Sequence, residues 1–145
     1  ALMPALQVYR ERFEPSAQLD RPYAMVGANV FAADTDDEGR RLFTSVQQAF
    51  ANMLRGTRGK LRPPIDDIDA YWTEAEKAHA SGMLSCSFVG SPETIRPALS
   101  RFIAETGADE LIVASAIYDH GARLKSYSLL AEVRKSMENS AAEEE

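Results

Sequence analysis

The hydrophobic residues of this chain follow two different spacings, which together predict an alternating series of helices and strands. Residues 3–13 place apolar side chains three or four positions apart, which predicts a short helix with one apolar face. Residues 23–33 form a nearly unbroken apolar run, which is typical of a parallel strand covered on both faces. Thr35, followed three positions later by Glu38, predicts the capped start of a second helix that ends near Gly56.

This alternation of predicted helices and strands is interrupted over residues 56–82. Glycines and a Pro-Pro pair predict an irregular excursion there, with one short helix at residues 73–80. A connection of this length inside an α/β fold is either a binding loop or a surface crossing without a role, and the sequence leaves both open.

Two further strands are predicted at residues 83–89 and 111–117, each followed by a helix. Ser91 and Pro92 favour the start of the first of these helices, in which Pro97 predicts a kink or a late start. The last helix is expected to begin at Asp119 or His120. The side chains expected on its buried face are Leu124, Tyr127, Leu130, Ala131 and Met137.

This order of elements predicts an α/β fold of parallel strands with flanking helices, joined by right-handed crossovers. A chain that opens on a helix and closes on a strand–helix unit is typical of the C-terminal half of a larger (β/α)8 TIM-type barrel. We therefore expect a partial barrel over residues 1–139 and a solvated, fraying acidic tail over residues 140–145.

Composition narrows the classes of partner. A formal net charge of -6 argues against nucleic acid, because phosphates would be repelled. The basic run Arg55, Arg58, Lys60 and Arg62 is interpreted as a solvated loop in preference to an anion site. The single Cys86 and the lack of a signal peptide or a membrane-spanning run favour a cytoplasmic protein that binds no membrane. Two histidines without spaced carboxylates are too few for a metal site.

The candidate site lies at the carboxyl ends of the strands, where parallel α/β folds bind ligands. Asn29 interrupts an apolar strand on the same side as Phe31, and its amide either faces a ligand or is satisfied internally. Gly90 and Ser91 precede a helix, so their amides either cradle an anion or simply start that helix.

The third strand end brings Ser115 and Tyr118 close to a possible acid–base group. His120 is the candidate catalytic base or hydrogen-bond donor, with Asp119 orienting it. In the alternative interpretation, Asp119 caps the last helix and His120 is merely exposed.

Several stretches, taken in order, resemble a known family. They are YRERFEPSAQLDRPYAMVGANVFAADTDDEGRRLF, QQAF, RGTRGKLRPPI, SFVGSPETIRPAL and ADELIVASAIYDHGARLKSYSLLAEV. Over about residues 6–133 they resemble the C-terminal half of the luciferase-like (bacterial-luciferase-like), flavin-dependent monooxygenases. The ordered set is specific, although each piece alone is weak.

The resemblance implies a (β/α)8 barrel that binds FMN. Reduced flavin would react with oxygen and oxygenate a small organic substrate, with a flavin reductase as the source of reduced flavin. The first helix would be the fifth of the barrel, and the three strands would be the sixth, seventh and eighth. The cofactor-binding positions would be Asn29, Phe31, Gly90, Ser91, Ser115 and Tyr118.

The same resemblance implies that the half of the barrel supplying most flavin contacts is missing, so that this chain is not competent alone. An inner face carrying Met25, Phe31, Phe88 and Ile112 would then be bare. We expect that face to associate with a second copy or with a separate N-terminal half. Two alternatives stay open: a non-catalytic half-barrel that serves binding or assembly, and a relative that transfers hydride with a flavin or a deazaflavin.

Overall fold

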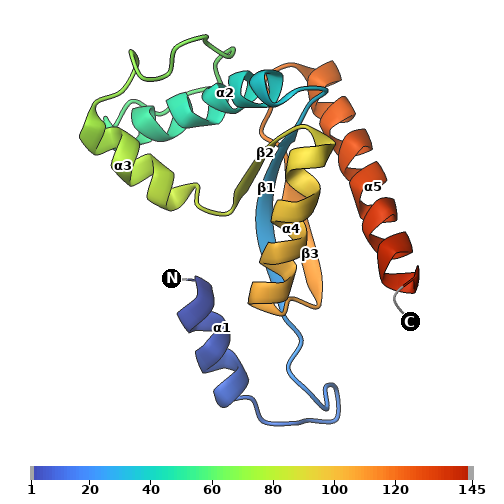
Figure 1. Ribbon diagram of the computed structural model, residues 1–145. Helices are drawn as coiled ribbons and strands as arrows, with labels where there is room; N and C mark the ends of the chain where they lie inside the picture. Colours follow the sequence, from blue (N-terminus) through green and yellow to red (C-terminus); the bar gives the residue numbers. More distant parts are fainter. Residues whose placement is uncertain (1, 144–145) are drawn as a thin grey trace.

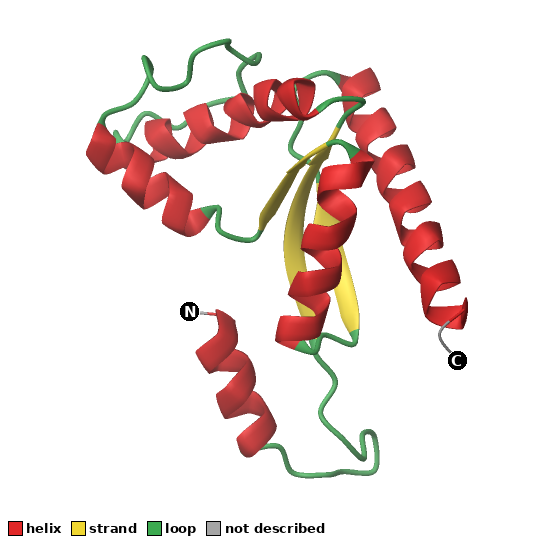
Figure 2. Ribbon diagram, viewed as in Figure 1, coloured by secondary structure: helices red, strands yellow, loops and turns green. Residues whose placement is uncertain are grey.

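A parallel sheet flanked by helices organises the chain (Figure 1, Figure 2). The computed structural model describes residues 2–143. Its elements in order are α1 (Leu2–Glu11), β1 (Met25–Ala32), α2 (Asp36–Leu54), α3 (Glu74–Met83), β2 (Ser87–Gly90), α4 (Pro92–Thr106), β3 (Glu110–Ala114) and α5 (His120–Glu143). The α/β class, the parallel strands and the flanking helices are confirmed. None of the described helices is long and apolar enough to cross a membrane.

The strand order is β2-β1-β3, with β1 at the centre. The carboxyl half of β1 pairs with β2, where Asn29 lies opposite Ser87. The amino half pairs with β3, where Gly27 lies opposite Ile112. If the three strands were the sixth, seventh and eighth of a barrel, β2 would lie between β1 and β3. The observed order instead places β1 at the centre.

This order places helices on both faces of the sheet. The connection to β2 and the connection back to β3 cross the sheet in opposite directions, and right-handed crossovers in opposite directions cover opposite faces. The packing agrees: Phe31 contacts Phe43 of α2 with ring centroids 4.8 Å apart. Its neighbour Val30 points the other way, into a cluster with Ile95 and Leu99 of α4.

Two members of the predicted bare face are therefore covered. Phe31 is fully buried, because α2 lies over the carboxyl end of that face. Phe88 belongs to the opposite face, where its ring packs against Phe102 at 5.2 Å. Met25 and Ile112 are exposed as expected, at 53% and 60%.

α1 lies against the amino end of the sheet (Figure 1). Its Leu6 is buried with Ala24 and Val26. Arg10 Nη2 donates hydrogen bonds to the carbonyl oxygens of Thr106 and Gly107 at 2.7 and 2.8 Å, and so satisfies acceptors at the C-terminus of α4.

Several observed boundaries differ from the predicted ones. α3 continues to Met83, so β2 begins only at Ser87. β3 ends at Ala114, three residues before its predicted end. α4 begins at Pro92 and runs through Pro97, so the late start is wrong. α5 extends to Glu143 into the expected tail, and residues 144–145 lie outside the described residues.

The predicted buried face of α5 is confirmed in part, because Leu130 and Met137 pack against the core. Leu124 and Tyr127 are exposed at 54% and 40%, whereas Ser126 is fully buried and Val133 nearly so. Ser126 Oγ accepts a hydrogen bond from the Ala32 amide at 3.0 Å. A serine, and not a larger apolar side chain, thus makes the contact between α5 and the end of β1.

Candidate functional site

One face of the sheet carries Met25, Gly27 and Ile112, which α2 does not cover, and we call this part the open face. Asn29 lies at its edge and is partly buried. Its Nδ2 donates to Ser87 Oγ of β2 over a long 3.4 Å. Gly27 is exposed two positions earlier on the same face. The structure shows no second partner for the Asn29 amide among the described residues. This side chain therefore remains the candidate for a polar contact with a ligand on the open face.

The predicted anion cradle at Gly90 and Ser91 is occupied by an internal carboxylate. Asp36 Oδ1 accepts a hydrogen bond from the Ser91 amide at 2.7 Å, and Asp36 Oδ2 accepts one from Thr94 Oγ1 at 2.9 Å. The Ser91 amide, followed by the Thr94 hydroxyl, lowers the pKa of Asp36 below its usual value. A flavin phosphate does not fit at this position, because Asp36 would compete for the same donors and repel its charge.

Two glycines allow this contact between α2 and the start of α4. Gly90 has φ +137°, and a side chain there would collide with the Asp36 carboxylate. A Cβ at Gly39 would lie 2.7 Å from the Gly90 nitrogen. Because neither glycine has a side chain, α2 and the start of α4 can approach closely. The acidic first turn of α2 therefore lies at the N-terminus of α4.

Ser115 and Phe31 do not face a ligand-accessible surface. Ser115 is buried, and its Oγ donates to the Val30 carbonyl at 2.7 Å. Its amide donates to the Tyr127 hydroxyl at 3.1 Å. Both residues stabilise the carboxyl end of β1, which is a structural role.

His120 is exposed at the start of α5. Its Nδ1 lies 2.7 Å from Arg123 Nη2. Asp119 Oδ1 instead accepts the Ala122 amide at 2.8 Å, so it caps the helix and does not orient the imidazole. The geometry therefore favours the alternative interpretation of this pair. The described residues contain no cluster of His, Cys, Asp and Glu that could hold a metal ion.

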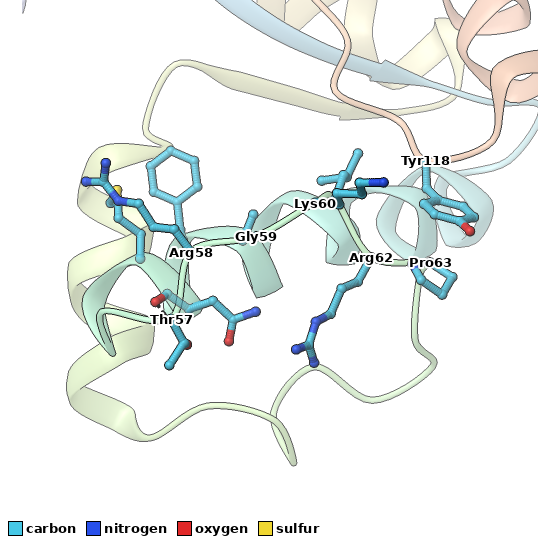
Figure 3. Close-up of a pocket in the computed structure, with 12 residues that line it drawn as sticks. Thr57, Arg58, Gly59, Lys60, Arg62, Pro63 and Tyr118 are labelled. Atoms are coloured by element: carbon cyan, nitrogen blue, oxygen red, sulfur yellow. Dashed lines mark hydrogen bonds between the residues drawn. The ribbon is translucent and has the colours of Figure 1, made fainter.

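A cavity of about 710 Å³ lies between α2 and residues 57–63, and Tyr118 closes one side of it (Figure 3). Figure 3 shows the Lys60 side chain extending toward Tyr118 and that of Arg62 extending into the hollow, whereas Arg58 extends toward the opposite end. Apolar side chains of the lining are Phe50, Met53 and Leu61. We call this hollow the basic cavity.

The four cations of the basic run separate into two groups. Arg55 forms an ion pair with Glu76, with Nε 2.7 Å from Oε1, and lies 4.9 Å over the Tyr71 ring. The Arg55 guanidinium, followed by the Thr73 amide, lowers the pKa of Glu76 to about 2. Arg58, Lys60 and Arg62 have no carboxylate partner among the described residues and border the basic cavity. The solvated-loop interpretation missed this cavity because Tyr118 is distant in sequence.

The segment that carries these cations is attached to α2. The Thr57 amide donates to the Asn52 carbonyl at 2.9 Å. Gln48 Nε2 donates to the Pro63 carbonyl at 3.0 Å, and the Ile65 amide donates to Thr44 Oγ1 at 2.9 Å. The backbone of α2 thus holds the start of this segment, and two buried polar side chains of α2, Gln48 and Thr44, hold its end.

Comparison with known proteins places this fold among named relatives. No family model matches the chain. It is 43% identical over 136 residues to an Escherichia coli (strain K12) protein named "Luciferase-like monooxygenase", covering 94% of this chain and 41% of that protein. It is 42% identical over 134 residues to the uncharacterized protein YvbT of Bacillus subtilis (strain 168), covering 92% of this chain and 40% of YvbT.

A solved structure agrees with these relatives. The crystal structure of apo-MsnO8 matches with a TM-score of 0.72 and 28% identity, over 92% of this chain and 41% of that chain. The chain thus spans about two-fifths of the length of the relatives it matches. That the matched part is their C-terminal half stays a prediction. Over nearly its whole length, the chain is therefore similar to part of a protein named luciferase-like monooxygenase.

Proposed function

We propose that this chain is part of a flavin-dependent, luciferase-like monooxygenase. The observation that carries the proposal is 43% identity to the E. coli relative over 94% of this chain. FMN, when bound in its reduced form, would supply the activation of oxygen. Partners of the full protein would be a small organic substrate and a flavin reductase.

The open sheet face supports a partial role for this chain. Met25 and Ile112 are more than half exposed, at 53% and 60%, on the face that also carries Gly27 and Asn29. Exposed apolar groups on a sheet mark a surface that another element covers. We propose that the remaining part of the full-length protein covers this face and supplies most flavin contacts.

Within that arrangement, two side chains of this chain would contribute to the site. Asn29 has one long hydrogen bond, at 3.4 Å, and would orient a ligand on the open face through its amide. Tyr118 lies at the edge of the basic cavity, after β3. No role in holding the flavin phosphate is assigned to Gly90 or Ser91, because Asp36 accepts the Ser91 amide.

A chimeric protein tests this proposal. This chain would replace the matched 136 residues of the E. coli relative, and FMN binding would be followed by flavin fluorescence and by oxygen consumption with reduced FMN. We expect saturable binding at micromolar FMN, weakened about tenfold by Asn29→Ala, since one well-placed polar contact contributes on the order of 1.4 kcal/mol. Asn139→Ala, an exposed asparagine of α5, is the matched control. A folded chimera that binds no flavin would contradict the proposal.

The exposed face also favours a second candidate, a non-catalytic half-barrel that serves assembly. Under that function the chain would associate through Met25 and Ile112 without supporting flavin turnover. A chimera that binds FMN but consumes no oxygen beyond free reduced flavin would support it.

A further inference from the structure

We propose that the basic cavity binds the anionic end, a carboxylate or a phosphate, of the organic substrate. Lys60, Arg62 and Tyr118 are the groups that would hold this anion, and Arg58 would contribute only through its charge. The assignment of the anion to a substrate rests on the proposed function, whereas anion binding itself does not.

The cations that border the basic cavity lack carboxylate partners. The chain carries a net charge of -6, and several of its cations are paired with carboxylates, as Arg41 is with Asp66 at 2.8 Å. Arg58, Lys60 and Arg62 fall within a short segment and have no such partner in the described part of the chain. Like charges held close together repel one another, and an anion between them relieves that repulsion.

The size and the lining of the basic cavity fit a small organic molecule. A volume of about 710 Å³ lies within the range of small-molecule sites, which enclose roughly 300–1,000 Å³. Phe50, Met53 and Leu61 supply apolar lining beside the cations. Such a combination fits a molecule with an apolar body and one anionic end, and a wholly polar ion would leave the apolar lining unused.

The basic cavity lies beside the end of a strand. Tyr118 comes from the connection between β3 and α5, so the cavity borders the carboxyl end of the sheet. The Lys60 side chain extends toward Tyr118 (Figure 3). A phenol hydroxyl and an ammonium group both donate to a carboxylate or a phosphate. An anion held there would leave the rest of the molecule directed along the carboxyl ends of the strands.

Hydrogen bonds to α2 hold the wall of the basic cavity in place. The Thr57 amide is bonded to the Asn52 carbonyl at 2.9 Å, and Gln48 holds the Pro63 carbonyl at 3.0 Å. Binding would therefore order little backbone, which lowers its entropic cost.

The test is an amide NMR titration of the ¹⁵N-labelled chain with benzoate, with uncharged benzyl alcohol as the matched probe. We expect benzoate to shift the amides of residues 57–63 and Tyr118, and benzyl alcohol to bind at least about tenfold more weakly. Lys60→Gln/Arg62→Gln should weaken benzoate about tenfold or more, and Arg58→Gln by less. Arg12→Gln/Lys135→Gln removes the same charge from exposed positions elsewhere and should change nothing.

Equal benzoate affinity in the two double variants would overturn the proposal, as would shifts confined to other parts of the chain. A second arm compares FMN with riboflavin, which lacks the phosphate. If FMN alone binds, and only through Lys60 and Arg62, the anion is the flavin phosphate and the assignment to a substrate is wrong. Benzoate binding together with a chimera that binds no flavin would sustain the anion site and reject the proposed function. A chimera that binds flavin, together with no benzoate binding at the basic cavity, would sustain the proposed function and reject the anion site.

Discussion

The carboxylate of Asp36 accepts a hydrogen bond from the amide of Ser91 at 2.7 Å, which joins the first turn of α2 to the N-terminus of α4. The two helices begin after neighbouring strands, β1 and β2. An acidic side chain of α2 thus occupies the position at the N-terminus of α4 where an external anion could bind.

Replacing Asp36 should both destabilise the chain and open the helix N-terminus to an external anion. Asp36→Ala is expected to lower Tm by several degrees, and Asp36→Asn by less, since the amide oxygen still accepts a hydrogen bond. Inorganic phosphate should raise the Tm of Asp36→Ala more than that of the unaltered chain. Identical phosphate responses in a thermal melt would contradict this account.

Glu76 makes a second contribution that depends on pH. Its pKa falls from 4.5 to about 2 in the folded chain because Arg55, followed by the Thr73 amide, stabilises the carboxylate. A depressed folded pKa stabilises the protein above the unfolded value, so this contribution is present above about pH 4.5 and is lost as pH falls toward 2.

Glu76→Gln should therefore lower Tm at neutral pH and flatten its dependence on pH over that interval. Thermal melts between pH 2 and 6, with a carbon-detected NMR titration of the Glu76 carboxyl, measure both effects. A carboxyl that titrates near 4.5 in the folded chain would show that the Arg55 contact does not hold in solution.

A pair of isoleucines distinguishes the two faces of the sheet. Ile95 of α4 is 1% exposed and Ile112 of β3 is 60% exposed. Ile95→Ala is expected to cost about 2–5 kcal/mol of unfolding free energy, because it removes buried methyl groups and leaves a cavity. Ile112→Ala should cost less than about 0.5 kcal/mol in a monomer. Urea unfolding of both variants provides the comparison, and similar losses would show that the Ile112 face is covered in solution.

The open face leads to a prediction about assembly. We expect the isolated chain to self-associate at micromolar concentration, burying Met25 and Ile112. Ile112→Lys should shift it toward monomer, because a buried ammonium is costly in an apolar interface. Leu19→Lys, at a 43% exposed position in the loop before β1, is the control. Analytical ultracentrifugation measures the association state of the three proteins. A monomeric unaltered chain would refute the prediction.

The hydroxyl of Ser126 can be tested separately. It accepts the Ala32 amide at 3.0 Å inside the protein. Ser126→Ala leaves that amide unpaired and should cost about 1–3 kcal/mol, whereas exposed Ser128→Ala should be close to neutral. Chemical denaturation of the two variants, together with amide exchange at Ala32, measures the difference.

The sequence predicted most helix starts because their determinants are local. Thr35 accepts the Glu38 amide at 3.2 Å, and Thr73 forms a complete capping box with Glu76. Gly107 ends α4 in the left-handed conformation, at φ +56°. Each of these signals lies within one turn of the boundary that it sets.

Non-local features escaped prediction for a physical reason. Asp36 and Ser91 meet only because α2 and α4 approach closely at Gly39 and Gly90, which no spacing in the sequence reveals. The strand order depends on pairing between segments that are distant in sequence, which local patterns do not reveal. Part of the buried face of α5 was mispredicted because a buried serine, Ser126, carries no hydrophobic signal.

The uneven pairing of β1 has a consequence for how the sheet can grow. β2 begins opposite Asn29, so the backbone groups of Met25–Ala28 that point away from β3 have no strand beside them in the described chain. This edge of the sheet therefore has a step of four residues, Met25–Ala28, which ends where β2 begins. A strand added beside Met25–Ala28 would have to end before it reached Ser87 of β2. The step therefore limits the length of such a strand, whatever its sequence.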